Sequence, residues 1–234
     1  MIIPPNLNEG DKIGIIAPAR KISFYELENA IEIIQSWKLE IIFGKFLFES
    51  ENQFSASIEK RVIDLQEMIN DNSIKGIFCA RGGYGTVQIV DHIDFYNLKC
   101  NPKWIVGFSD ITVLHSQLNN IGLASLHASM PINFPKNTSE SLNSVYKCLF
   151  GLENIVKFQS NKFNRIGETD SEIIGGNLSI LYSLLGSKSD LNTDGKILFI
   201  EDLDEYLYHL DRMMTNLKRN GKFDKLNGMI VGAM

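Results

Sequence analysis

Cysteine is scarce in this chain of 234 residues, and long apolar runs are missing. The three cysteines, Cys79, Cys100 and Cys148, are widely spaced and odd in number, which fits neither a disulfide framework nor the CxxC spacing of zinc sites. No apolar stretch approaches the roughly 20 residues of a membrane span. Residues 1–5 (MIIPP) lack the basic and then apolar layout of a signal peptide. We therefore expect a cytoplasmic protein without a membrane partner.

Positive charge is also in short supply. The 23 Lys and Arg residues are outnumbered by 28 Asp and Glu residues, which gives a net charge of −5, and they form no basic run. Nucleic-acid-binding domains normally present a basic face, so no nucleic-acid partner is expected. The length is sufficient for one large globular domain or two modest ones.

Short β-branched runs alternate with helical patterns from the start of the chain. Ser23 and Glu26 have the spacing of a helix capping box, and residues 57–70 carry apolar side chains with a helical period. We expect strands at 12–16, 39–43, 74–79 and 104–108, with helices at 23–38 and 57–70. This order predicts an α/β fold of flavodoxin or Rossmann type, whose parallel sheet is covered on both faces.

The pattern changes after residue 135. Residues 154–165 are polar and irregular, as in a linker or a β-rich connection. Beyond them we expect helices at 177–185 and 205–219 and strands at 196–201 and 228–231. The domains are therefore predicted as an N-terminal α/β domain over 1–135, a linker region over 136–165 and a smaller C-terminal α/β domain over 166–234. Because the last strand ends with the sequence, we expect this second domain to be incomplete and the chain to be a fragment.

Residues 104–112 (WIVGFSDIT) are the most informative stretch. An apolar run ends in Gly-x-Ser-Asp, and a helical pattern follows at once. A strand that turns sharply into a helix would hold the Ser109 hydroxyl at the mouth of the sheet, with backbone amides directed at the group it attacks. This arrangement is typical of a serine nucleophile. The structural alternative is that Ser109 caps the helix. The stretch also departs from the usual G-x-S-x-G elbow, because Ile111 stands in place of the second glycine.

A glycine-rich loop, residues 81–86 (RGGYGT), follows another predicted strand. It fits a phosphate loop, a tight turn, or a loop whose Gly82 and Gly83 amides form an oxyanion hole. Arg81 could bind a substrate carboxylate or form an ordinary salt bridge. Because parallel strands end at one edge of the sheet, this loop and Ser109 should share that edge, which is the candidate site.

Other titratable residues offer weaker alternatives. Glu201 ends an apolar strand, where a carboxylate can orient a histidine. His127 should lie near the same edge, where we expect a satisfied structural histidine, and His115 lies too far along its helix to reach Ser109. Cys79 is a possible thiol nucleophile, although a small buried hydrophobe is favoured. A metal site is the remaining alternative, although the spacing of its candidate ligands fits no standard motif. Its ligands would be Glu201, Asp202, Asp204 and His209.

Six segments, taken in order, resemble the LD-carboxypeptidase family of serine peptidases, which includes the microcin C self-immunity peptidases. They are residues 10–18 (GDKIGIIAP), 81–85 (RGGYG), 107–112 (GFSDIT), 175–178 (GGNL), 197–202 (ILFIED) and 211–213 (DRM). The resemblance covers essentially the whole chain. It implies an N-terminal α/β sheet domain and a smaller C-terminal domain, with the active site between them.

The resemblance also implies a Ser-Glu-His triad. Ser109 matches the nucleophile and Glu201 the carboxylate that orients the histidine. Amides of the Gly82-Gly83 turn and of Asp110 match the oxyanion hole. The family's histidine lies downstream of the strand matched by residues 228–232, so we expect it beyond this chain.

The activity implied by the family is hydrolysis of an L,D-peptide bond in a cytoplasmic muropeptide, with release of the terminal D-alanine during cell-wall recycling. The family further suggests a homodimer and requires neither a metal nor an organic cofactor. Two alternatives stay open. One is a peptidyl-nucleotide hydrolase of the microcin C type on the same scaffold, and the other is a non-catalytic ligand-binding protein.

Overall fold

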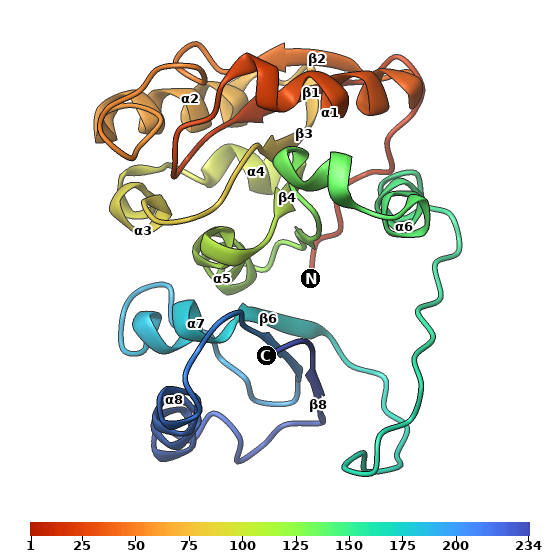
Figure 1. The fold of residues 1–234 in the computed structure, drawn as a ribbon, viewed down its shortest axis with the longest axis vertical. Coiled ribbons are helices and arrows are strands. Elements are labelled where there is room, and N and C mark those ends of the chain that lie inside the picture. Colours follow the sequence, from red (N-terminus) through yellow and green to blue (C-terminus); the bar gives the residue numbers. More distant parts are fainter.

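Two parallel β-sheets, one above the other in Figure 1, organise the computed structural model, which describes residues 1–234. The larger sheet has five strands in the order β2-β1-β3-β4-β5, and the smaller has three in the order β6-β7-β8. Every strand pair in both sheets is parallel. The order of the larger sheet is that of flavodoxin-like folds, so the predicted fold class is confirmed.

The predicted elements occur within a few residues of their expected bounds. The strands are β1 Lys12–Ile16, β2 Glu40–Phe43, β3 Ile74–Cys79, β4 Trp104–Gly107, β5 Leu126–His127, β6 Ile173–Asn177, β7 Ile197–Glu201 and β8 Gly228–Val231. The helices are α1 Phe24–Ser36, α2 Ile58–Asn70, α3 Thr86–Ile89, α4 Tyr96–Cys100, α5 Thr112–Asn120, α6 Ser139–Leu149, α7 Leu178–Leu184 and α8 Leu207–Arg219. Short 3₁₀ helices occupy Val90–His92 (η1), Ser109–Ile111 (η2) and Pro131–Lys136 (η3). None of the helices combines the length and the apolar character needed to cross a bilayer.

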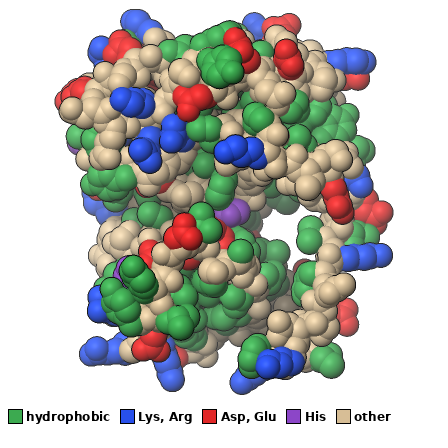
Figure 2. Space-filling model, viewed as in Figure 1, with side chains coloured by type: hydrophobic (Ala, Val, Ile, Leu, Met, Phe, Trp, Pro, Cys, Tyr) green, Lys and Arg blue, Asp and Glu red, His purple; other side chains and the backbone are tan.

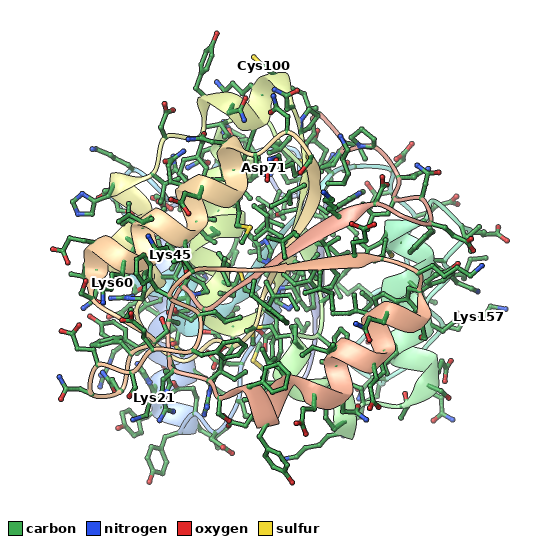
Figure 3. All side chains as sticks on the ribbon, turned by 90° about the horizontal axis from the view of Figure 1, so that it is seen from above. Lys21, Lys45, Lys60, Asp71, Cys100 and Lys157 are labelled. Carbon is green, nitrogen blue, oxygen red and sulfur yellow. The ribbon has the colours of Figure 1, made fainter.

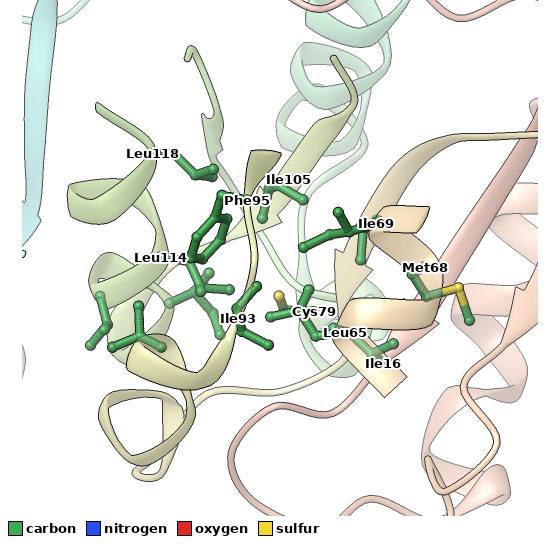
Figure 4. Close-up of a cluster of buried hydrophobic side chains, with 14 of the residues drawn as sticks. Ile16, Leu65, Met68, Ile69, Cys79, Ile93, Phe95, Ile105, Leu114 and Leu118 are labelled. Carbon is green, nitrogen blue, oxygen red and sulfur yellow. The ribbon is translucent and has the colours of Figure 1, made fainter. Parts of the chain in front are cut away.

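Helices cover both faces of the larger sheet. One core lies between the sheet and α1, η3 and α6, and the other between the sheet and α2, α4 and α5 (Figure 4). In β4, Trp104 and Val106 point into the first core while Ile105 points into the second, because side chains alternate along a strand. Burial of both faces explains why these strands are continuously apolar in the sequence.

The smaller sheet carries α7 and α8. Leu198 and Ile200 of β7 are buried with Leu181 of α7. The sequence analysis did not predict β6, although it pairs with β7 along its whole length. Its Gly175 and Gly176 are poor strand formers. Gly175 is required there, because a Cβ at this position would lie on the Phe199 carbonyl and its φ is +121°.

The two sheets are connected by an extended segment. Residues 152–172 contain no helix or strand and run along the outside of the molecule from α6 to β6 (Figure 1). In Figure 2 an open gap separates part of this segment from the body. Within the predicted linker region, α6 instead packs Val145 and Leu149 into the core of the larger sheet. The division into domains over 1–135 and 166–234 stays a prediction.

Candidate active site

Ser109 forms the sharp turn between β4 and α5. Its φ is +60°, in the left-handed region that residues other than glycine rarely adopt. It begins η2, and neither η2 nor α5 has a side-chain capping hydrogen bond. The alternative that Ser109 is a helix cap is therefore wrong. A strained serine between a parallel strand and a helix is instead typical of a nucleophile elbow.

His115 supports the strand end that precedes this turn. Its Nε2 lies 2.9 Å from the Gly107 carbonyl oxygen and its Nδ1 lies 2.8 Å from Ser125 Oγ. Because a carbonyl can only accept, Nε2 carries the proton and Nδ1 accepts from the serine hydroxyl. Burial lowers the pKa of His115 to about 4. This neutral imidazole is engaged at both nitrogens, as expected for a residue that does not serve Ser109.

The glycine loop packs directly against the Ser109 turn. A Cβ added to Gly82 would lie 3.4 Å from Ser109 Cβ and 3.5 Å from the Asp110 amide nitrogen. Gly83 has φ +113°, and the amides of Gly82 and Gly83 donate no hydrogen bond within the chain. The structure thus brings together the residues that were predicted to surround an oxyanion, whose role stays a prediction.

Arg81 is engaged within the N-terminal half of the chain. Its Nη1 donates to the Lys21 carbonyl at 3.2 Å and lies 3.5 Å from Oε1 of Glu26, the capping-box residue of α1. The structure thus shows the salt bridge that was one of the two alternatives for Arg81, and its partner is Glu26. A role in binding a substrate carboxylate stays a prediction.

Glu201 reaches the same region from the smaller sheet. It ends β7, and its Oε1 lies 3.9 Å from Nε2 of His127. His127 pairs with Gly107 in the larger sheet, two residues before Ser109. Burial, and to a smaller extent the neighbouring Asp202, raises the pKa of Glu201. Its Oε1 is buried without a hydrogen-bond partner. A carboxylate oxygen in this state is available to a further donor.

His127 differs from its expected role. Burial lowers its pKa to about 3, so the imidazole is neutral at pH 7 and its contact with Glu201 is not an ion pair. Its Nδ1 is buried without a partner. The expectation of a satisfied structural histidine is therefore wrong. The prediction failed because the surroundings of His127 come from the other sheet. Strand β7 places Glu201 and the Phe199 ring against the imidazole, and the two ring centroids are 5.1 Å apart.

We expect His115, which is buried, and His127, which is partly buried, to make the protein sensitive to acid. Between pH 6.5 and their folded pKa values of about 4 and about 3, the unfolded chain binds protons that the folded chain does not. The free energy of unfolding should therefore fall as the pH falls, by about 1.4 kcal/mol per pH unit for each histidine. His127→Gln should remove one of these contributions. Urea unfolding at several pH values between 6.5 and 4 measures the difference.

The exposed His92 offers a matched control, since His92→Gln also replaces one histidine but removes no imidazole from the contact between the two sheets. Asp64 acts in the opposite direction, because burial raises its pKa to about 6 and the folded protein takes up that proton first. Its contribution is common to all variants and cancels in the comparison. An identical pH dependence in His127→Gln and wild type would contradict a neutral, partly buried imidazole at position 127.

A chain of hydrogen bonds connects α5, the helix that follows Ser109, to the strand of Glu201. The Asn177 amide donates to Thr112 Oγ1 at 3.0 Å, and Asn177 Nδ2 donates to Asp202 Oδ1 at 3.0 Å. The close approach depends on Gly176, where a Cβ would lie 2.5 Å from Thr112 Oγ1. Sequence reasoning assigned no role to Thr112 or Asn177, although both lie in segments that resemble the family, 107–112 and 175–178. These bonds determine where Glu201 stands relative to Ser109.

Two of the four residues weighed as a metal site, Asp202 and His209, have other partners. Asp202 accepts from Asn177 Nδ2 and from two backbone amides, and His209 pairs with Glu205. Across residues 1–234, no group of three or more His, Cys, Asp or Glu side chains could hold a metal ion.

The thiol alternative is also unsupported by the geometry. Cys79 is fully buried in the core shown in Figure 4, and burial raises its pKa far above the ordinary value, so a thiolate is disfavoured. Cys100, by contrast, is exposed at the edge of the molecule in Figure 3.

Two family models match most of the chain. The LD-carboxypeptidase N-terminal domain matches residues 13–128, which include Ser109, the glycine loop and His127. The LD-carboxypeptidase C-terminal domain matches residues 170–234, which include Glu201.

Relatives and solved structures agree with this match. A probable murein peptide carboxypeptidase from Bacillus subtilis (strain 168) is 35% identical over 240 residues, covering 97% of this chain and 73% of the relative. The crystal structure of a muramoyltetrapeptide carboxypeptidase from Oxalobacter formigenes superposes with a TM-score of 0.88 at 27% identity, covering 95% of this chain and 77% of that one. An MccF-like protein from Bacillus anthracis has a TM-score of 0.88 at 26% identity, covering 99% and 80%.

Proposed function

The chain belongs to the LD-carboxypeptidase family, and on this basis we propose that it is a serine carboxypeptidase acting on murein peptides. The reaction is hydrolysis of an L,D-peptide bond with release of the terminal D-alanine. The observation that carries the proposal is the left-handed φ of +60° at Ser109, in a turn against which Gly82 packs. We further propose that the protein works as a homodimer in the cytoplasm, on fragments recycled from the cell wall.

In the proposed mechanism, Ser109 Oγ attacks the carbonyl carbon of the scissile bond while an imidazole accepts its proton. The negative charge that develops on the carbonyl oxygen is stabilised by the amides of the Gly82-Gly83 turn and of Asp110. The imidazole then protonates the leaving amine of D-alanine, and water hydrolyses the acyl-enzyme. Glu201 orients this imidazole and stabilises its charged form.

The imidazole is not supplied by His115, which is bonded at both nitrogens. His127 is a poor proton acceptor, because its pKa is about 3. We propose that the triad histidine lies outside residues 1–234, as the family resemblance implies. The Oε1 atom of Glu201 supports this, since it accepts no hydrogen bond within residues 1–234.

The proposal is tested by incubating the native gene product with a murein tetrapeptide that ends in D-alanine and with the same peptide ending in L-alanine. We expect free D-alanine from the first peptide and no alanine from the second, because the site must distinguish the configuration of the leaving residue. A fluorophosphonate should label the enzyme on Ser109, as located by peptide mass mapping.

Equal release from both peptides would overturn the L,D specificity. The peptidyl-nucleotide alternative would be favoured if Ser109 is labelled, no alanine is released and an aminoacyl sulfamoyl adenosine is hydrolysed. The absence of both labelling and hydrolysis would contradict the serine mechanism and favour a binding protein.

A further inference from the structure

A buried arginine lies behind the glycine loop. Arg61 of α2 is 2% exposed and donates hydrogen bonds to backbone carbonyls of three different segments. Its Nη1 donates to Pro18 at 2.8 Å and to Gly85 at 3.0 Å, and its Nε donates to Ala56 at 3.1 Å. One guanidinium thus binds the loop after β1, the entry to α2 and the loop after β3. The mechanism proposed above gives this residue no role.

Asp110, the residue after the nucleophile, is bonded to the same loop. It is 1% exposed, and its Oδ2 accepts a hydrogen bond from the Thr86 amide at 2.9 Å. The carbonyl of Gly85 and the amide of Thr86 are the two ends of one peptide group. Arg61 therefore holds the oxygen end of this peptide and Asp110 holds its nitrogen end.

The peptide has little freedom between these two partners. Gly85 has φ +142°, and a Cβ there would lie 2.6 Å from Arg61 Nη1 and 3.2 Å from Ala19 Cα. A donor at the carbonyl and an acceptor at the amide also polarise the peptide in the same sense, so the two bonds reinforce each other. The orientation of the Gly85-Thr86 peptide is thus fixed by two buried side chains, one on α2 and one beside Ser109.

We propose that Arg61 and Asp110 are positioning residues that hold the glycine loop against Ser109 through the Gly85-Thr86 peptide. The inference rests on the proposed function, since it assigns the loop amides to the oxyanion hole. These amides act only if they stay at a set distance from the reacting carbonyl, and a loosened loop stabilises the transition state less than a fixed one. Substrate binding in the ground state depends less on this distance. Loss of either side chain should therefore lower kcat more than it changes KM.

The sharpest test compares Asp110→Ala with Asp110→Asn. The alanine variant removes the acceptor for the Thr86 amide, whereas the asparagine variant keeps an oxygen acceptor of similar size. We expect kcat for D-alanine release to fall about 10- to 100-fold in Asp110→Ala, with KM within about threefold, and to recover largely in Asp110→Asn. Arg61→Lys keeps the positive charge but loses the several N–H donors of the guanidinium, and its kcat should fall by a similar factor. Asp91→Ala, at an exposed site in η1, is the matched control and should be unchanged.

Two further readouts do not depend on turnover. Hydrogen exchange at the Thr86 amide should be faster in Asp110→Ala than in wild type, and the rate of fluorophosphonate reaction at Ser109 should fall with kcat. If wild type is labelled but releases no D-alanine, the substrate proposal fails while a slower labelling of Asp110→Ala still supports the positioning role. Unchanged exchange and unchanged labelling in both Asp110→Ala and Arg61→Lys would overturn the inference. Equal loss of kcat in Asp110→Asn and Asp110→Ala would also overturn it.

Discussion

Replacing Ser109 by alanine should lower kcat for D-alanine release by about 10⁴-fold or more, because in the proposed mechanism Oγ forms the acyl bond. In the structure, this substitution should affect the reaction without affecting folding. Ser109 Oγ takes part in no hydrogen bond that folding depends on, and alanine at φ +60° carries the same Cβ strain as serine. The free energy of unfolding should therefore stay close to that of wild type. D-alanine release and urea unfolding of the same preparations give both quantities.

A second serine provides the control for this prediction. Ser36 is exposed at the end of α1, and Ser36→Ala should keep wild-type activity. Activity of Ser109→Ala within tenfold of wild type would exclude Ser109 as the nucleophile. The residual rate of the variant would then have to come from another group at the edge of the sheet.

Glu201→Gln should lower kcat by about 10³- to 10⁴-fold while leaving the fold intact. In the proposed mechanism, the carboxylate accepts a hydrogen bond from the triad imidazole and stabilises its positive charge. An amide in its place offers an N–H, which favours the wrong tautomer of the ring. Because Oε1 of Glu201 has no partner within residues 1–234, the substitution breaks no hydrogen bond made by that atom. Steady-state kinetics with the murein tetrapeptide measures the loss.

Asp204→Asn is the matched control for Glu201. Asp204 is exposed in the turn that follows β7, and its φ of +61° suits asparagine as well as aspartate. It should retain full activity. If Glu201→Gln turned over substrate within threefold of wild type, the carboxylate would have no part in orienting the base, and the triad assignment would be wrong.

The nucleophile turn was predictable from the sequence because its signals are local. An apolar run, a Gly-x-Ser-Asp turn and a helical pattern all lie within a few residues of Ser109. The departure from the usual elbow also has a physical reason. Ile111 replaces the second glycine and is fully buried, and it packs so closely under the strand end that a Cβ at Gly107 would lie 2.8 Å from its Cγ1.

The relation between the two sheets could not be predicted in this way. Thr112 and Asn177 are 65 residues apart, and no local pattern indicates that a hydroxyl on one helix accepts from an amide at the end of β6. The role of His127 was wrong for the same reason, since its surroundings depend on side chains from β7. Residues in contact across a junction leave no periodic signal in a single sequence.

Arg61 shows a further limit of pattern reading. A charged residue in an amphipathic helix normally indicates the solvent face, and α2 carries its apolar stripe at other positions. In the structure Arg61 is as buried as the core, because three loops turn their carbonyls toward it. A side chain that satisfies backbone groups of distant loops is visible only once those loops are placed.

The larger and the smaller sheet approach each other closely at Gly176 because this residue has no side chain. A Cβ there would lie 2.5 Å from Thr112 Oγ1 and 3.3 Å from His127 Nδ1, with φ at +147°. Larger residues at this position would act as a wedge between the sheets and carry Glu201 away from Ser109. Ser109 and the glycine loop would stay together at the edge of the larger sheet, while Glu201 on the smaller sheet would lie farther from both. In the proposed mechanism, the spacing between Ser109 and Glu201 therefore depends on a position that carries no side chain.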